Sequence, residues 1–178
     1  MPFKRPNKIL DEAPLYDYAI AALGRRMRSV AELKRLMRAR VTNDEHGTLL
    51  VECVVARLKE QKYLDDRNYA ASYSAYRRDN ERFGRRRVAT DLKAKGIHPE
   101  VIEKAVEETY GDVNEMELAR AFIRRKRLKK PASNRDAART FRALMRAGFT
   151  MATSVKLLKN WDVEEEVLTA LQEEATEI

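Results

Sequence analysis

Residues 83–106 read FGRRRVATDLKAKGIHPEVIEKAV, and they decide the fold class because they describe two helices and the turn between them. Val88 and Leu92 stand four positions apart, which is the spacing of neighbours on one face of a helix. Gly96 follows at a position where helices commonly end in the left-handed conformation. Pro99 then occupies the favoured first position of another helix. The stretch therefore predicts a helix, a glycine turn and a second helix.

The segment that contains this glycine turn recurs along the chain. Residues 36–41 read LMRARV, residues 92–97 read LKAKGI and residues 144–149 read LMRAGF. Each segment begins with Leu and closes on an apolar residue, and their starts lie 56 and 52 residues apart. A period of about 50 residues is typical of proteins built from repeated small modules.

We therefore expect an all-α fold of three tandem three-helix modules, stacked into an elongated, curved, solenoid-like body. Ser29 and Glu32 form the pattern of a capping box at one helix start, and Ser133 with Asp136 suggests another. No segment alternates apolar and polar residues for long enough to predict a strand. The expected parts are a flexible N-terminal segment (1–13), three repeats (14–64, 65–111 and 112–161) and an acidic C-terminal helix or tail (162–178).

Composition narrows the class of protein. The 178 residues carry a net charge of +8, and such an excess of positive charge attracts polyanions, either nucleic acid or acidic protein surfaces. No stretch approaches the ~20 apolar residues that span a bilayer, and the N-terminus lacks an apolar signal region. The single cysteine, Cys53, excludes an internal disulfide framework, and its apolar surroundings predict a buried thiol. A cytoplasmic protein without a membrane partner fits these observations.

Basic residues cluster at the same place in each predicted module, where its first helix is followed by its second. In residues 120–130, RAFIRRKRLKK, seven positive charges occur with no acid. Stacked modules would join the clusters into one basic stripe, although a solvated face is the ordinary explanation of a single run. The candidate residues of this stripe, for binding nucleic acid or an acidic protein surface, are Arg25, Arg26, Arg35, Arg38, Arg77, Arg78, Arg85, Arg86, Arg87, Lys93, Lys95, Arg124, Arg125, Lys126, Arg127, Lys129 and Lys130.

Residues with catalytic or metal-binding chemistry are sparse. His46 and His98 have no partners at metal-ligand spacing. The six glycines form neither a phosphate-binding loop nor a dinucleotide fingerprint. The adjacent Asp65 and Asp66 are explained by capping of a helix N-terminus. We therefore expect a protein that is not an enzyme, with no catalytic residue, no metal site and no cofactor.

The C-terminal tail is acidic, and two interpretations of it stay open. Val163, Val167 and Leu171 recur at helical spacing, so the tail can cover apolar surface of the third module. Alternatively, its acids compete with a partner for the cluster at residues 124–130. The acidic residues are Asp162, Glu164, Glu165, Glu166, Glu173, Glu174 and Glu177.

Three motifs together resemble those of the RecX family. SVAELKRLM (29–37) resembles its S-x-x-E-L opening, and YLDDRNYA (63–70) resembles its Tyr-Leu-Asp-Asp motif. FGRRRVATDLKAKGI (83–97) resembles its block of an aromatic-Gly pair followed by Arg, Leu and Lys-Gly-Ile. The resemblance covers roughly residues 15–161. Arg85 departs from it, since the family often has proline there, and the acidic tail extends past the family's usual end.

The resemblance implies the three-module helical fold and a function. Proteins of this family bind the RecA recombinase filament on DNA, lie in its helical groove, and lower its ATPase and strand-exchange activities. By resemblance, this chain is a regulator of recombination, DNA repair and the SOS response that acts as a monomer on the RecA filament. Single- or double-stranded DNA is then a partner within the filament, or weakly alone. The alternative is a helical DNA-binding protein that acts without RecA and places GRRRVATDLKAK (84–95) in a major groove.

Overall fold

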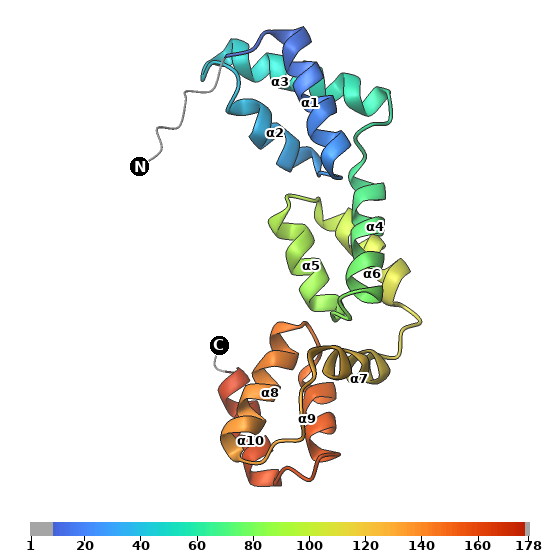
Figure 1. The fold of residues 1–178 in the computed structure, drawn as a ribbon, viewed down its shortest axis with the longest axis vertical. Helices are drawn as coiled ribbons and strands as arrows, with labels where there is room; N and C mark the ends of the chain where they lie inside the picture. The colour runs from blue at the N-terminus through green and yellow to red at the C-terminus, as the bar shows by residue number, and fades with distance from the viewer. Residues whose placement is uncertain (1–8, 177–178) are drawn as a thin grey trace. The chain divides into compact units, whose positions relative to one another are not determined.

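A computed structural model describes residues 9–176, and all regular secondary structure in that range is helical (Figure 1). The expectation of an all-α fold is therefore confirmed. The helices are α1 (Glu12–Arg25), α2 (Val30–Arg38), α3 (Glu45–Glu60), α4 (Asp66–Asp79), α5 (Arg85–Ala94), α6 (Pro99–Tyr110), α7 (Glu115–Lys126), α8 (Asn134–Arg146), α9 (Met151–Lys159) and α10 (Glu165–Thr176).

Short polar side chains start several of these helices, because they satisfy backbone N–H groups that have no partner within the first turn. Ser29 and Glu32 form the predicted reciprocal capping box at the start of α2. At the start of α8, Ser133 accepts a hydrogen bond from Asp136 N, as expected. The second half of that box is absent, because the Ser133 hydroxyl donates to the Asp136 carboxylate instead.

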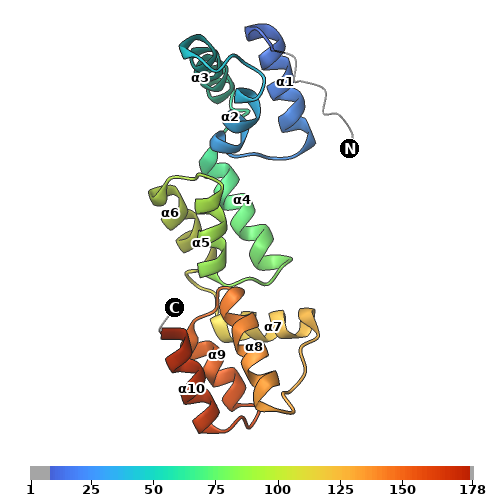
Figure 2. The ribbon, with the colours of Figure 1, turned by 90° about the vertical axis from the view of Figure 1, so that its left-hand side faces the viewer.

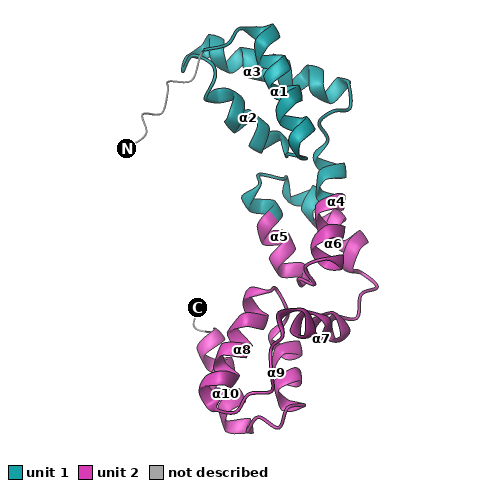
Figure 3. Ribbon diagram, in the orientation of Figure 1, with its two compact units in different colours: residues 1–70, 92–102 teal, residues 71–91, 103–178 magenta. Residues whose placement is uncertain are grey.

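The chain divides into two compact units (Figure 3). Unit 1 comprises residues 1–70 and 92–102, and unit 2 comprises residues 71–91 and 103–178. Helices α4, α5 and α6 each contribute residues to both units. The division into three modules with two terminal segments stays a prediction, and most of the expected N-terminal segment, residues 1–13, lies outside the described residues.

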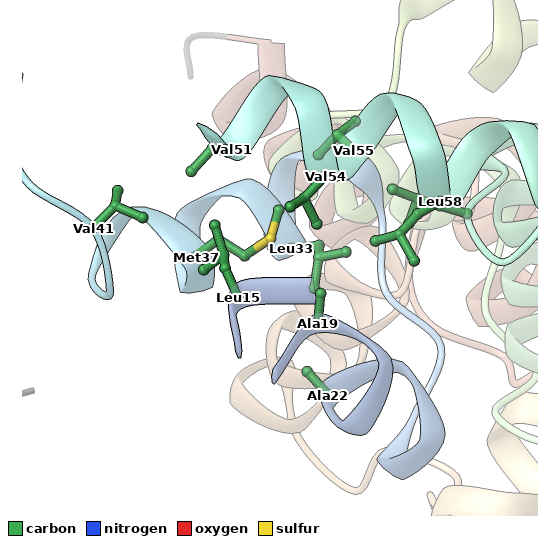
Figure 4. Close-up of a cluster of buried hydrophobic side chains, with 11 residues drawn as sticks. Leu15, Ala19, Ala22, Leu33, Met37, Val41, Val51, Val54, Val55 and Leu58 are labelled. Carbon is green, nitrogen blue, oxygen red and sulfur yellow. The ribbon is translucent and has the colours of Figure 1, made fainter. Parts of the chain in front are cut away.

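The core of unit 1 lies among α1, α2 and α3, which contact one another. Figure 4 shows Leu15 and Ala19 of α1 directed toward Leu33 of α2 and the valines of α3. The buried hydrophobic side chains of α3 lie on one face, at Val51, Val54, Val55 and Leu58. Cys53 lies off this face and is exposed. The expectation of a buried thiol was wrong, because the apolar run in the sequence is longer than the buried face of the helix.

An apolar cluster of unit 2 lies among α8, α9 and α10, which contact one another (Figures 1 and 2). Phe141 of α8, Leu158 of α9, and Leu168 and Leu171 of α10 are its buried members. The acidic helix α10 thus covers apolar surface with one face, as the first interpretation of the tail requires. Its glutamates occupy exposed positions.

Two of the recurring segments end their helices in the same way. Gly96 and Gly148 both have positive φ, at 75° and 89°. In each case the residue after the glycine donates a backbone hydrogen bond to the carbonyl of the segment's leucine, Leu92 or Leu144. This is the Schellman pattern of a helix C-terminus. Both leucines are fully buried, whereas Leu36 in the first segment is only partly buried.

Each of these glycine turns packs against the start of an earlier helix. In unit 2, Gly84 N, just before α5, donates to Ala147 O at the end of α8 over 2.8 Å. A Cβ atom on Gly148 would lie 2.2 Å from Arg87 N, so no side chain fits there. In unit 1, a Cβ atom on Gly96 would lie 2.5 Å from the Cβ of Ala31 in the first turn of α2. In each unit, the end of one helix therefore packs against the start of another, and a glycine without a side chain allows the close approach.

Burial at Leu92 leads to a first prediction. Leu92→Ala should lower the free energy of unfolding by about 2–5 kcal/mol, the usual cost of removing a fully buried leucine side chain. Urea unfolding followed by circular dichroism measures this loss. Ala94→Ser on the exposed side of the same helix is the control, and it should change stability by less than ~0.5 kcal/mol. A loss below ~1 kcal/mol for Leu92→Ala would contradict its assignment to the core.

Candidate polyanion-binding surface

The predicted basic residues of unit 1 lie at the end of α1, on α2 and near the end of α5. Arg25, Arg35, Arg38 and Lys93 are exposed, and none of them has an ion-pair partner among the described residues. Arg26 is also exposed, with its Nη2 atom 3.4 Å from Glu32 Oε1. These side chains are accessible to a ligand.

Lys95 differs because it belongs to a polar junction within unit 1. Its ammonium lies 3.3 Å from Glu32, and its backbone carbonyl accepts a hydrogen bond from Ser29 Oγ. Burial raises the pKa of Glu32, but the hydrogen bond from Ser29 N and the charge of Lys95 outweigh burial and leave that pKa below its ordinary value. Lys95 thus stabilises the start of α2, a structural role.

The two aspartates of the YLDDRNYA motif also contribute to helix starts. Asp65 Oδ1 accepts hydrogen bonds from Arg67 N and Asn68 N, in the first turn of α4. Asp66 Oδ1 instead accepts from Val30 N, the first residue of α2, over 2.8 Å. Capping of its own helix explains Asp65, as expected, whereas Asp66 instead caps a helix 36 residues earlier in the chain.

Arg77 is held inside unit 2 by a charged cluster. Its Nη2 atom lies 2.6 Å from Asp91 Oδ2, which also accepts a hydrogen bond from Tyr73. Its guanidinium carbon stands 4.4 Å from the centre of the Phe83 ring, and only 20% of its side chain is exposed. These contacts join α4 to α5, so Arg77 stabilises the unit rather than offering a free charge.

Arg78 has a structural role of a similar kind. Its Nη1 atom donates a 2.7 Å hydrogen bond to the Thr109 carbonyl near the end of α6. Its guanidinium also pairs with Asp79. The last carbonyls of a helix lack partners within the helix, and a basic side chain there satisfies one of them. Of the predicted site residues, Arg77, Arg78 and Lys95 thus have structural roles within the fold.

The first turn of α5 carries three exposed arginines. Arg85 pairs with Glu107 at 3.2 Å and Arg87 with Asp91 at 3.0 Å, while Arg86 has no ion-pair partner among the described residues. The turn contains no acidic residue. Positive side chains at a helix N-terminus oppose the helix dipole, so they do not help this helix to form. An anion bound there would relieve that opposition.

The run from Arg124 to Lys130 covers the end of α7 and the segment that follows it. Arg127 ends the helix in the left-handed conformation with φ 52°, and all the basic residues of the run are exposed. Arg125 pairs with Glu81 at 3.4 Å, and Lys130 pairs with Asp162 at 2.6 Å. Arg124, Lys126, Arg127 and Lys129 have no ion-pair partner within residues 9–176.

A cleft of about 810 Å³ lies beside this run, entirely within unit 2. Residues 126–132 line one part of it, and α8 contributes Arg139 and Arg146. These two arginines are not among the basic residues predicted from the sequence. A signal was present, because Arg135, Arg139, Arg142 and Arg146 recur at spacings of four, three and four, which places them on one face of α8. Arg142 pairs with Glu174 of α10, whereas Arg139 and Arg146 have no such partner among described residues.

Glu115 secures the start of α9 in the same unit. Its carboxylate accepts hydrogen bonds from Thr150 N at 2.9 Å, from the Thr150 hydroxyl at 2.6 Å and from the Thr153 hydroxyl. Burial raises the pKa of Glu115, but these hydrogen bonds lower it by more, so that the pKa lies below its ordinary value of 4.5. The ionised carboxylate therefore stabilises the folded state.

A pH-dependent prediction follows for Glu115→Gln. Since the folded-state pKa is depressed, the carboxylate stabilises the protein above its unfolded-state pKa, and this contribution disappears as pH falls through the folded-state pKa. The variant should lose about 1–3 kcal/mol near neutral pH, and the loss should shrink toward pH ~3. Urea unfolding at several pH values measures it. Glu117→Gln, at an exposed ion pair, is the control, and a loss independent of pH for Glu115→Gln would refute the argument.

The structure offers no centre for metal chemistry within the part of the chain that it describes. No group of three or more His, Cys, Asp or Glu side chains there could hold a metal ion. Among the same residues, no helix has the length and apolar character needed to cross a membrane. The site that remains is a set of exposed basic side chains on helices and their connections.

An all-helical protein with an exposed basic surface is thus the class that fold and site define. The family model "RecX, second three-helix domain" matches residues 65–106. The regulatory protein RecX of Myxococcus xanthus is 31% identical over 170 residues, which cover 87% of this chain and 89% of that protein. A regulatory protein RecX of Thermus thermophilus is 32% identical over 149 residues, covering 84% of this chain and 91% of that protein. The chain belongs to the RecX family of regulatory proteins.

Solved structures agree on the fold. A crystal structure of regulatory protein RecX matches with a TM-score of 0.63 and 23% identity, covering 84% of this chain and 71% of that chain. RecX from Lactobacillus salivarius matches with a TM-score of 0.64 and 18% identity, covering 84% and 96%. At these identities the likeness concerns the helical fold alone.

Proposed function

We propose that this chain binds the RecA nucleoprotein filament through its basic surface and lowers the filament's ATPase and strand-exchange activities, thereby regulating recombination and DNA repair. Membership of the RecX family supports a regulatory role. We further propose that it acts in the cytoplasm as a monomer, without catalysis, and that DNA is contacted within the filament or weakly alone.

The observation that carries this proposal is the set of exposed cations in unit 2 that form no ion pair among the described residues. Arg86, Arg124, Arg127 and Lys129 have no ion-pair partner among the described residues, and neither have Arg139 and Arg146. Like charges repel one another, so these cations do not stabilise the fold through their charge. A RecA filament on DNA offers both phosphates and protein surface, and either can supply the missing negative charge.

The decisive experiment measures the ATPase rate of RecA filaments on single-stranded DNA as this protein is added. Inhibition is expected at protein concentrations well below those that coat the same naked DNA. An unchanged ATPase rate at concentrations of this protein that saturate the DNA would refute the proposal.

The second candidate is a protein that acts on DNA without RecA. The observation that favours it is the first turn of α5, where Arg85, Arg86 and Arg87 are exposed. Recognition helices commonly contact bases with the residues of their N-terminal turn. Tight binding to duplex DNA together with no effect on the RecA ATPase would favour this candidate.

A substitution tests the surface itself. Replacing Arg85, Arg86 and Arg87 with Ala should weaken binding to the filament at least ~10-fold, which corresponds to the loss of about 1.4 kcal/mol. Stability should change little, because exposed ion pairs such as Arg85–Glu107 contribute at most about 1 kcal/mol. Fluorescence anisotropy with labelled filaments measures the affinity, and circular dichroism checks the fold.

The matched control removes the same charge from elsewhere in unit 2. Lys104, Lys156 and Lys159 are exposed and lie outside the clusters described above. Their replacement with Ala should leave filament binding within ~2-fold of the original value, since distant surface charges are screened at physiological salt. Equal losses for the two triple variants would mean that only net charge matters and that this surface is not the site.

A further inference from the structure

The residues that line the cleft in unit 2 are of two kinds, which differ in their exposure to solvent. Its buried and half-buried lining residues are apolar apart from Thr140, and they include Phe122, Leu128, Pro131 and Ala143. Its exposed lining residues, apart from Ala132 and Asp136, are basic. A ligand for this cleft therefore needs an apolar group to meet the inner surface and negative charges to meet the outer one.

Most of the basic side chains at the cleft form no ion pair among the described residues. Arg87 and Lys130 form ion pairs, with Asp91 and Asp162. Arg127, Lys129, Arg139 and Arg146 form none among the residues that the structure describes. The lone acid of the lining, Asp136, accepts a hydrogen bond from Ser133 at the start of α8. The charge of the cleft is thus strongly positive, and the single acid of its lining does not neutralise it.

The aromatic rings of the cleft are poorly placed to stack on nucleic-acid bases. Phe122 is only 4% exposed, and the ammonium of Lys126 stands 6.0 Å from its ring centre. The guanidinium carbons of Arg77 and Arg87 stand 4.4 and 5.9 Å from the centre of the Phe83 ring. Binding of single strands without sequence preference relies on accessible aromatic faces on which bases stack. Here cations lie over those faces, which favours a ligand other than a nucleic-acid strand.

We propose that this cleft binds a short acidic peptide segment of a partner protein, with one large apolar side chain as its anchor. The volume of about 810 Å³ is within the range of sites that enclose small ligands, about 300–1,000 Å³, and suits one or two side chains rather than a duplex. Carboxylates flanking the anchor pair with Arg139, Arg146 and Lys129. The inference rests on the proposed function only in that the RecA filament would supply the peptide.

Fluorescence anisotropy with a labelled peptide tests this site directly, without RecA or DNA. The probe is a run of alternating Asp and Glu that ends in Leu-Phe, and the comparison peptide ends in Ser-Ser. We expect the Leu-Phe peptide to bind at least ~10-fold more tightly, since burial of large apolar side chains strengthens binding by that order. Equal affinity of the two peptides would overturn the proposal, because the apolar part of the cleft would then be unused.

Two double variants locate the binding. Lys129→Ala with Arg139→Ala should weaken peptide binding at least ~10-fold, a loss of about 1.4 kcal/mol. Lys104→Ala with Lys156→Ala removes the same charge away from the cleft and should change binding less than ~2-fold. All four residues are exposed, so both proteins are expected to fold, which circular dichroism verifies. Equal effects of the two variants would exclude the cleft as the site.

The competing occupant is a nucleic-acid strand, and an unlabelled oligothymidine of the same charge distinguishes it. Peptide binding that the oligonucleotide displaces only at higher concentration than unlabelled peptide supports the proposal. Stronger displacement by the oligonucleotide overturns it. The RecA ATPase assay is independent of these results: normal peptide binding without ATPase inhibition would refute the proposed function alone, and the reverse result would refute the peptide site alone.

Discussion

Removal of residues 163–178 should strongly destabilise unit 2. The deletion takes away α10, whose Leu168 and Leu171 are 0% and 6% exposed in the cluster with Phe141 and Leu158. Burial of each leucine contributes about 1.5–3 kcal/mol, so the loss should reach about 3–6 kcal/mol. This is a large part of the ~5–15 kcal/mol that typically holds a folded domain together. Urea unfolding followed by circular dichroism should show an earlier transition.

The control for this deletion separates packing from charge. Glu166 and Glu173 are exposed and form no ion pair among the described residues, so Glu166→Gln with Glu173→Gln keeps the packed face of α10. This double variant should unfold like the original protein. If the acids of α10 competed with a partner for residues 124–130, the same variant would also bind the partner more tightly at low salt. A deletion variant with unchanged stability would contradict the packing role.

The contacts of α10 favour packing over competition. Glu174 pairs with Arg142 and Glu165 pairs with Lys159, both outside the run of residues 124–130. Among the described residues, the one ion pair between the tail and that run comes from Asp162, which precedes the helix and pairs with Lys130. These exposed pairs contribute little individually. The apolar face of α10 therefore accounts for its position.

Gly148→Ala should lower the free energy of unfolding of unit 2 by about 3–5 kcal/mol, through strained backbone and a steric clash. The φ angle of Gly148 is 89°, which residues with a side chain rarely adopt. A Cβ atom there would also lie 2.2 Å from Arg87 N and 2.6 Å from Arg87 Cβ. The turn after α8 would then have to move away from the start of α5. Thermal unfolding by calorimetry measures the loss.

Gly24→Ala is the matched control for this substitution. Gly24 lies in α1, and a Cβ atom added to it meets nothing within 4 Å. The variant should be slightly more stable, by about 0.5–1 kcal/mol, because glycine is less favourable than alanine inside a helix. A Gly148→Ala protein as stable as the Gly24→Ala protein would show that the close approach at Gly148 is not required.

Local sequence patterns predicted the helices well. The capping box of Ser29 and Glu32, the start of α6 at Pro99 and the glycine turns at Gly96 and Gly148 all appear as expected. Each depends on residues within about five positions of one another, and helix geometry converts such spacings directly into contacts. The same reasoning was wrong for Cys53, because an apolar neighbourhood in the sequence does not say which face of a helix is covered.

Long-range packing decided how the basic residues are used. The sequence alone determined that the chain is helical, strongly basic and provided with arginine and lysine clusters at recurring positions. Only the tertiary structure decided that Arg77 pairs with Asp91 and that Arg78 donates a hydrogen bond to the Thr109 carbonyl. It also decided that Arg139 and Arg146 line the same cleft as residues 126–130. A helical contact is set by spacing along the chain, whereas a charged side chain pairs with whichever group packing brings within a few ångströms.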